Sequence, residues 1–267
     1  MADPADSFRF ATIWCGSIYH SIPKPMCTVT YIVHGRDKYF TSNRDENKLR
    51  PVAAMPQTIT WNGKNITFPR DPHAGGTWFA VTQTGTIAIL LNGAFETHVP
   101  VYPYKKSRGL VLLEMVAEEY VHEFFEQYDL SGIEPFTIIL FNHDRLFELR
   151  WNSRRKFSKQ LAADKNHIWS SATLYSAAVS KKREDLFRIF EATHPFRDAG
   201  IIRNFHSDNH ADDQNGFIIN RSNGIQTQSI TQAILREDQL TLIHQDLFSK
   251  EQQEQVIQLT KRIAIRE

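Results

Sequence analysis

A cysteine, an arginine and a carboxylate are the residues of this chain best placed to do chemistry. Cys27 opens the apolar run 26–33, and a turn at 34–37 leads into a second arm that ends in Arg44 and Asp45. Cys27 and Arg44 are 17 positions apart (44 − 27). That spacing gives each arm of a hairpin about eight residues at ~3.3 Å per residue, so the far ends meet. A nearby cation favours the ionised thiol, and we predict an activated cysteine nucleophile.

Two interpretations of Cys27 are open at this point. A cysteine in an apolar strand is often a small buried hydrophobic residue. However, Met26 directly precedes Cys27. If the chain starts at Met26, removal of that methionine leaves Cys27 with a free α-amine, which has a pKa near ~8 and can act as the base for its own thiol. One residue would then supply both nucleophile and base.

Four sequence features together resemble the NRDE family, which includes the transport and Golgi organisation 2 proteins. They are Met-Cys at the start of a strand, the tetrad Asn-Arg-Asp-Glu at 43–46, Ala-Gly-Gly-Thr-Trp at 74–78, and a strand that ends in Leu91-Asn92. Their order and spacing hold from Cys27 to about Arg108. The resemblance implies an N-terminal-nucleophile hydrolase-like fold of class α+β, with four αββα layers and two stacked, mainly antiparallel sheets.

The resemblance also implies roles for individual residues. Arg44 would favour the Cys27 thiolate, Asp45 would orient the amine, and the side-chain amide of Asn92 would donate to an oxyanion. The substrate pocket would involve residues that approach the ligand by side chain or backbone: Asn43, Gly75, Gly76, Ser171 and Gln228. Without the resemblance, a plain turn is the more frequent explanation for both the glycine pair and Asn92-Gly93.

Three departures from the related patterns bear on the substrate. Cholylglycine and penicillin V acylases carry an acid three positions after the arginine, whereas this chain has Asn47 there and Asp45 next to Arg44. The family's late Leu-Ser-Asn is here Trp-Ser-Ser at 169–171, and its Gly-Thr-Arg is Gln-Thr-Gln at 226–228. The pocket therefore lacks one amide donor and one cation.

Composition sets the protein class. The 267 residues include 41% hydrophobic residues and carry a formal net charge of +1, which is ordinary for a globular protein and gives no reason to expect nucleic acid as a partner. Only Cys15 and Cys27 are present, which excludes a disulfide scaffold and favours a reducing, cytoplasmic location. We expect no membrane span, because no apolar run approaches ~18 residues. We expect a small-molecule amide as the partner; the oligomeric state does not follow from the sequence.

Residues 1–25 precede the expected single domain at 26–267. They begin with Asp3, Pro4 and Asp6 and have no basic region followed by a continuous apolar run, so they do not fit a secretory signal. A misassigned start, a propeptide cleaved before Cys27 and a genuine extension are the three alternatives. We favour the first, because Pro23-Lys24-Pro25 breaks the chain just before Met26.

The remaining pattern predicts helices at 110–128, 180–193 and 251–265. Hairpins are expected at 136–151 and 225–246, a strand at 167–171, and a small surface hairpin within 51–72. Lys181, Lys182 and Arg183 begin the second helix, as a solvated basic edge or a site for an anion. Segment 205–223 contains histidines and aspartates, but its polar composition favours a loop. We therefore expect no metal site and no cofactor.

Two functions agree with these features. The first is a cysteine amidohydrolase that cleaves a non-peptide carbon–nitrogen bond in a small molecule. The second is a non-catalytic binding or trafficking protein that keeps the same fold. Cys27 and Arg44 favour the enzyme, and the altered positions late in the chain favour the binding protein.

Overall fold

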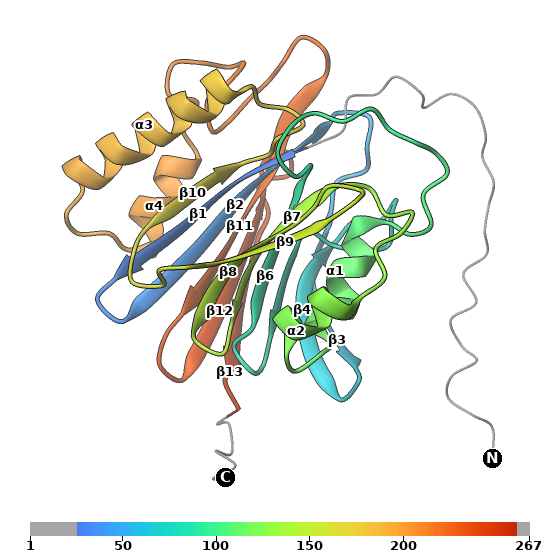
Figure 1. Cartoon of the computed structure of the whole chain (residues 1–267). Coiled ribbons are helices and arrows are strands. Elements are labelled where there is room, and N and C mark those ends of the chain that lie inside the picture. The colour runs from blue at the N-terminus through green and yellow to red at the C-terminus, as the bar shows by residue number, and fades with distance from the viewer. Residues whose placement is uncertain (1–25, 261–267) are drawn as a thin grey trace, which may run out of the picture.

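The computed structural model describes residues 26–260, which form two stacked β-sheets with helices on the outside (Figure 1). The six-stranded sheet has the order β10-β1-β2-β11-β12-β13, and its strands are β1 (Met26–His34), β2 (Asp37–Asn47), β10 (His167–Ser170), β11 (Ile225–Leu235), β12 (Gln239–Asp246) and β13 (Gln252–Gln258). The seven-stranded sheet runs in chain order and contains β3 (Ala54–Trp61), β4 (Lys64–Arg70), β5 (Phe79–Thr82), β6 (Ile87–Asn92), β7 (Phe136–Asn142), β8 (Arg145–Trp151) and β9 (Lys156–Leu161). Every strand pair in this part of the chain is antiparallel.

The helices complete four layers. The described helices are α1 (Arg108–Val116), α2 (Val121–Gln127), α3 (Ala177–Thr193) and α4 (Ala199–His206). α1 and α2 contact the seven-stranded sheet, and α3 and α4 contact the six-stranded sheet, so each sheet has one helix-covered face and one face toward the other sheet (Figure 1). The predicted four-layer α+β fold is confirmed.

The alternation of side chains along β1 and β2 divides the apolar residues between two cores. Tyr31 and Phe40 point toward the seven-stranded sheet, where the Phe40 ring lies 5.6 Å from that of Phe141. Their neighbours Ile32 and Tyr39 point the other way and pack with residues of α3 and α4. β2 is therefore buried on both faces, and its last nine residues are all buried. This explains how a run of polar residues at 43–47 comes to lie inside the protein.

The predicted hairpins at 136–151 and 225–246 are confirmed, as is the strand that begins at residue 167. The hairpin expected on the surface within 51–72 exists as β3 and β4, but it belongs to the seven-stranded sheet. Ile66 and Phe68 of β4 are fully buried there.

The single helix predicted over 110–128 is wrong, because the chain forms α1 and α2 with a break between them. Asn142 and His143, in the turn between β7 and β8, make hydrogen bonds to the carbonyl of Glu119 at 3.4 and 3.1 Å. These tertiary contacts occupy a carbonyl that would otherwise accept a bond within the helix.

The helix predicted at 251–265 is also wrong where it is described, since 252–258 form β13, and residues 261–265 lie outside the described part. Side chains of β13 alternate between exposed and half-buried, with period two. The amide groups of Gln253 and Gln255 both donate to the carbonyl of Pro56. Pairing with the edge of β12 overrides the helical propensity of this Gln- and Glu-rich segment.

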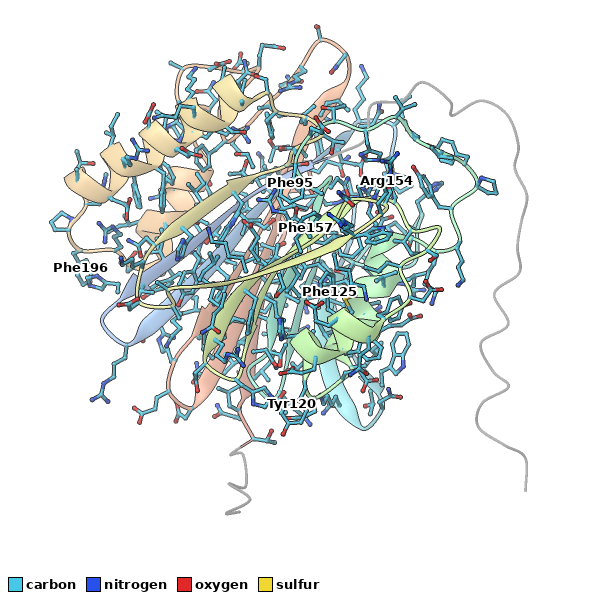
Figure 2. The ribbon with its side chains drawn as sticks, in the orientation of Figure 1. Phe95, Tyr120, Phe125, Arg154, Phe157 and Phe196 are labelled. Carbon is cyan, nitrogen blue, oxygen red and sulfur yellow. The ribbon has the colours of Figure 1, made fainter. Side chains whose placement is uncertain are left out.

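Two elements were not predicted. α4 overlaps the start of the segment assigned to a polar loop, and Asp198 caps it by accepting a 2.8 Å hydrogen bond from the Ile201 amide, a signal that the sequence does carry. β9 is a polar edge strand without alternation. Figure 2 shows Phe95 beside Phe157 of β9, and their rings are 4.9 Å apart.

Candidate active site

The hairpin of β1 and β2 brings Cys27 to Arg44. The backbone register pairs Cys27 directly with Arg44, and Met26 with Asp45, as the equal arms predicted. The side chain of Cys27 lies outside the described residues, so its contacts are not part of the site's geometry. The structure establishes the backbone position of Cys27, which is on β1 directly opposite Arg44 of β2.

The tetrad divides between the two faces of β2. Arg44 and Glu46 face the seven-stranded sheet, whereas Asn43 and Asp45 face α3 and α4. The Asn43 amide donates to the carbonyls of His206 and Phe217 at 2.8 and 3.0 Å, and its oxygen pairs with the His206 ring. The structure therefore separates Asn43, a predicted substrate contact, from Arg44.

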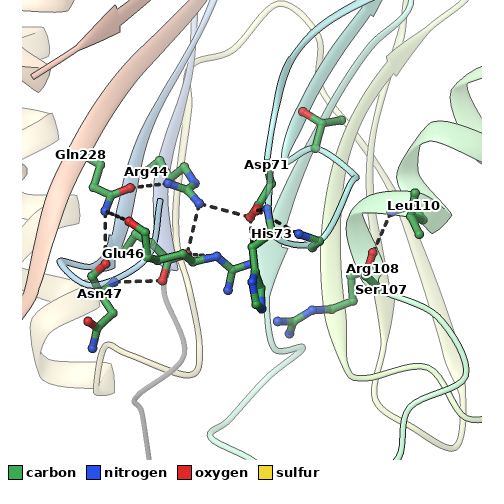
Figure 3. Close-up of polar contacts among 12 residues, drawn as sticks. Arg44, Glu46, Asn47, Asp71, His73, Ser107, Arg108, Leu110 and Gln228 are labelled. Carbon is green, nitrogen blue, oxygen red and sulfur yellow. Dashed lines mark hydrogen bonds and ion pairs between the residues drawn. The ribbon is translucent and has the colours of Figure 1, made fainter. Parts of the chain in front are cut away.

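Arg44 lies at the centre of a buried polar cluster between the sheets (Figure 3). It is 4% exposed, and its guanidinium makes 3.2 Å contacts with the carboxylates of Glu46 and Asp71 and donates to the side-chain oxygen of Gln228. The Trp78 ring stacks against it, 4.7 Å from the guanidinium carbon to the ring centroid. Arg44 thus bridges the two sheets.

Arg50 completes the charge balance of this cluster. Its guanidinium contacts Asp71 at 2.8 Å and Glu46 at 3.4 Å, so two arginines face two carboxylates. Burial raises the pKa of Glu46, because the charged form loses solvation there. Burial acts in the same direction on Asp71, but the charges of Arg50 and Arg44 outweigh it and lower the pKa of Asp71. The ionised cluster is close to neutral overall.

The loop at 71–76 holds the Asp71 carboxylate in place. One carboxylate oxygen accepts from the amides of His73 and Ala74 at 2.9 and 3.1 Å, which leaves the other oxygen for the arginines. The Asp71 amide donates to the carbonyl of Gly76, closing the loop. The Ala-Gly-Gly-Thr-Trp element therefore contributes to the same cluster as the Asn-Arg-Asp-Glu tetrad.

Backbone conformation and packing explain why both residues of the Gly75-Gly76 pair are glycines. Gly75 has φ +72°, a conformation that side chains rarely adopt, and a Cβ on Gly76 would lie 2.4 Å from the carbonyl carbon of Gly109, at the start of α1. The close approach predicted at Gly76 is made by the backbone of another part of this chain.

We expect Gly76→Ala to lower the free energy of unfolding by about 1–3 kcal/mol, because neither backbone can yield without moving the Asp71 loop or α1. Urea unfolding measures the change. Gly200→Ala in α4 is the matched control, since its Cβ would meet only the Asp198 carboxylate oxygen at 3.3 Å. Equal stability of the two variants would show that the loop and helix can separate freely.

Asp45 is fully buried on the helix side of β2. It accepts hydrogen bonds from Tyr175 at 2.6 Å and Thr227 at 2.7 Å. Burial raises the pKa of Asp45 to about 6, although Arg183 and the two hydrogen bonds act in the opposite direction.

Arg183 corrects the prediction of a solvated basic edge on the second helix. It is fully buried, donates to the hydroxyl of Thr28 and the carbonyls of Asn215 and Gly216, and stacks 3.6 Å above the ring of Tyr175. Lys181 and Lys182 do match the prediction, since both are on the surface in ion pairs with aspartates. The Thr28 contact means that Arg183 anchors the residue that follows Cys27.

A β-bulge in β11 places the side chain of Gln228 within hydrogen-bonding distance of Arg44. The pairing of β11 with β2 shifts between Thr227, opposite Asp45, and Ser229, opposite Arg44. The extra residue in the bulge is Gln228, whose amide group also donates to the carbonyl of Asn47 at 3.2 Å. The structure thus brings together Arg44 and Gln228, two of the predicted site residues.

Asn92 and Ser171 form a second pair of predicted residues that the fold brings together. β6 contacts β1 across the sandwich. Ser170 of β10 pairs with Thr28 of β1, so the next residue, Ser171, lies beside the start of β1. The Ser171 hydroxyl donates to the Asn92 carbonyl at 2.6 Å, and the Thr173 hydroxyl donates to the same oxygen at 3.0 Å. These bonds fix the backbone at the end of β6.

Sequence reasoning missed Asp71, Trp78 and Arg50 as site residues. Trp78 is the last residue of the Ala-Gly-Gly-Thr-Trp motif, but no local sequence pattern indicates that its ring stacks on Arg44. Within residues 26–260, no group of three or more His, Cys, Asp or Glu side chains is arranged to hold a metal ion. The helices of this part include none that is long and apolar enough to cross a bilayer.

Comparison with known proteins gives the family of the chain. The transport and Golgi organisation 2 family matches residues 26–260, which include both motifs of the buried cluster. The chain belongs to this family. No curated protein matches the chain.

Solved structures similar to this family member share its fold. A variant of conjugated bile acid hydrolase from Clostridium perfringens superposes with a TM-score of 0.54 at 9% sequence identity, over 89% of this chain and all of that one. A second variant of the same hydrolase gives 0.52 at 9% identity, over 89% of this chain and 97% of that one. This chain therefore shares the fold of that bile acid hydrolase, which confirms the predicted N-terminal-nucleophile hydrolase-like fold class.

Proposed function

We propose that this protein is an N-terminal cysteine amidohydrolase that cleaves a non-peptide carbon–nitrogen amide bond of a small molecule. The observation that carries the proposal is the register of β1 and β2, which pairs Cys27 with Arg44 in a fold shared with a bile acid hydrolase. Thr28 and its partner Asn43 face the helices, so strand alternation predicts that the preceding pair faces the space between the sheets.

In the proposed reaction, the α-amine of Cys27 takes the thiol proton and the sulfur attacks the amide carbonyl carbon. The negative charge moves to the carbonyl oxygen, which accepts hydrogen bonds from the Asn92 side chain and a backbone N–H. The carbon–nitrogen bond then breaks, the amine leaves with a proton, and water hydrolyses the thioester. A nucleophile of this kind fits the reducing cytoplasm, where we place the protein.

The contacts of Asp45 and of the predicted pocket residues change the roles that we propose for them. Asp45 lies opposite Met26 in the register, close to the amine that we assign it to orient, but it acts from the helix side of β2. Gln228 accepts a hydrogen bond from Arg44, and Ser171 donates one to the Asn92 carbonyl, so in this proposal both residues position a catalytic neighbour. Asn43, Gly75 and Gly76 would shape the site through the backbone.

One observation favours the alternative, a non-catalytic binding or trafficking protein. The charge of Arg44 is already balanced by Glu46 and Asp71, with Gln228 as a further partner. A balanced cation favours a neighbouring thiolate less than a free one does, so the reactivity of Cys27 decides between the two functions.

The deciding experiment expresses the full reading frame and measures intact mass, alkylation and hydrolysis. We expect a mature chain that begins at Cys27, whose thiol is then the only one in the protein. It should react with iodoacetamide about tenfold faster than an ordinary thiol at neutral pH, with a rate that titrates below pH 8. Release of 7-amino-4-methylcoumarin from a panel of its N-acyl amides should be abolished by Cys27→Ala.

An active protein that retains residues 1–25 would contradict the self-activating mechanism, because an amine within a peptide bond cannot act as a base. A Cys27 inert to alkylation in the folded protein, with no hydrolysis of the panel, would favour the binding protein.

A further inference from the structure

Four buried polar atoms without hydrogen-bond partners gather beside Arg44. Within residues 26–260 they are the hydroxyls of Ser42 and Ser229, the indole nitrogen of Trp78 and the Nε2 atom of His244. The Nε atom of Arg50 in the same cluster also lacks a hydrogen bond, but it lies 3.4 Å from the Glu46 carboxylate in an ion pair. Each of these four side chains is at least nine-tenths buried. Buried polar groups normally find a partner, because leaving one unsatisfied costs about 1–3 kcal/mol.

The strand registers place these groups on one face in two adjacent cross-strand rows. The first row contains Asp246, Ser229, Arg44 and Cys27 on β12, β11, β2 and β1. The second row contains His244, Thr231, Ser42 and Val29 on the same four strands. Neighbouring strands lie about 4.8 Å apart, so the polar residues of β12, β11 and β2 in these rows form one polar patch, which ends at Val29 of β1 in the second row.

Trp78 faces this patch from the opposite sheet. Its ring centroid lies 6.0 Å from that of His244, and its other neighbour is the guanidinium of Arg44. His244 is held by a 2.8 Å hydrogen bond between its Nδ1 atom and the Thr231 hydroxyl. The imidazole is thereby fixed in orientation, with Nε2 as its remaining hydrogen-bonding atom.

The patch has no unmatched cation. Arg44 and Arg50 are matched by Glu46 and Asp71. The Asp246 carboxylate, at the end of the first row, accepts from the backbone amides of Phe248 and Ser249 at 2.7 and 2.9 Å. Burial lowers the pKa of His244 to about 4, so its ring is neutral at pH 7. The groups left to bind a ligand are an N–H donor, an imidazole nitrogen and two hydroxyls, none of which favours a charged partner over an uncharged one.

We propose that Ser42, Trp78, Ser229 and His244 form a subsite beside Arg44 that binds an uncharged group able to donate and accept hydrogen bonds, such as a primary amide. The proposal rests on the proposed amidohydrolase function and specifies the polar group that the substrate presents next to the scissile bond. It also predicts that a carboxylate of the same size and shape as the amide binds poorly. The cluster has no unmatched cation to offset the cost of burying the carboxylate's charge.

Binding to the Cys27→Ala protein tests the subsite separately from catalysis. We expect hexanamide to bind and to raise the melting temperature, and hexanoate to bind at least about tenfold more weakly. Trp78→Phe and Ser42→Ala should each weaken hexanamide binding by about tenfold, a hydrogen bond's share of affinity. Ser42→Ala should not lower the melting temperature of the unliganded protein, because it removes an unsatisfied polar atom. Trp78→Phe also loses buried ring volume beside Arg44, so it should lower the melting temperature as a Trp→Phe change elsewhere in the core does.

Trp151→Phe is the matched control, since the Trp151 indole N–H already donates to the Ile133 carbonyl at 2.9 Å. It should lower the melting temperature and leave hexanamide binding unchanged. The subsite is refuted if Trp78→Phe and Ser42→Ala bind hexanamide as the parent does, if hexanoate binds as well as hexanamide, or if only ordered water occupies these atoms and neither probe binds. Hexanamide binding without any hydrolysis by the native protein would instead refute the amidohydrolase and leave the subsite standing.

Discussion

Arg44→Met is expected to lower the free energy of unfolding by about 3–5 kcal/mol, the largest effect of a single substitution in this site. The methionine keeps much of the length of the side chain but removes the charge. Glu46 and Asp71 would then share one cation, Arg50, in a region where solvent cannot compensate. Breaking a buried ion pair from one side leaves an uncompensated charge, which costs far more than the pair contributes.

Urea unfolding at pH 7 measures this loss, with Arg36→Met as the control. Arg36 forms a 3.5 Å ion pair with Glu237, but both side chains are more than 80% exposed, so the control should change stability very little. Adding Asp71→Asn to Arg44→Met should restore part of the stability, because it removes one of the stranded charges. Equal stabilities for Arg44→Met and Arg36→Met would mean that the Arg44 cluster carries no net electrostatic energy.

The same substitution tests the chemistry assigned to Arg44. If its charge favours the Cys27 thiolate, the titration of iodoacetamide alkylation should move upward by roughly one pH unit in Arg44→Met, equivalent to about 1.4 kcal/mol. Asp45→Asn should affect alkylation less and turnover more, since Asp45 is assigned to the amine. An alkylation rate that ignores Arg44 would assign Arg44 to structure alone.

Acidification from pH 7 to pH 4 is expected to remove about 3 kcal/mol of stability through His206 alone. Burial lowers the pKa of His206 to about 3, with smaller effects from His210 and Arg183, against an ordinary value of 6.5. Between these two values the unfolded chain binds a proton that the folded protein does not, so stability falls as the pH falls. His244, whose pKa burial lowers to about 4, acts in the same direction.

Asp45 opposes this loss. Its pKa rises from 3.8 in the unfolded chain to about 6 in the folded protein, so between these values the folded protein binds more protons. Its contribution to stability therefore increases as the pH falls through that window, by about 2 kcal/mol at pH 4. The native protein should show the sum of these opposing contributions. Glu46, whose pKa is raised, acts in the direction of Asp45, and Asp71, whose pKa is lowered, acts in the direction of the histidines.

Variants separate the two contributions when stability is measured by urea at both pH values. His206→Gln should lose about 3 kcal/mol less than the native protein on acidification, and Asp45→Asn about 2 kcal/mol more. Comparing each variant with itself at two pH values removes the constant cost of the substitution. A native-like pH dependence in His206→Gln would show that the ring takes up a proton without unfolding.

Local sequence determined the parts of this protein that depend on neighbouring residues. The turn at 34–37 and the equal arms around it place Cys27 opposite Arg44, because a hairpin's register follows from its turn. Alternating apolar runs likewise predict the hairpins of β7 with β8 and β11 with β12. The motifs at 43–46 and 74–78 indicated the family and its four-layer fold, although not the reason why the two motifs occur together.

Only the tertiary structure supplied that reason. Asp71 and Trp78 reach Arg44 from the opposite sheet, and no local pattern encodes a contact between sheets. Burial of β2 on both faces sends Asn43 and Asp45 to the helices and Arg44 to the space between the sheets. Similarly, the edge of β12 turned a helix-forming segment into β13, because unpaired backbone groups at that edge bind a strand more strongly than the segment's own propensity favours a helix.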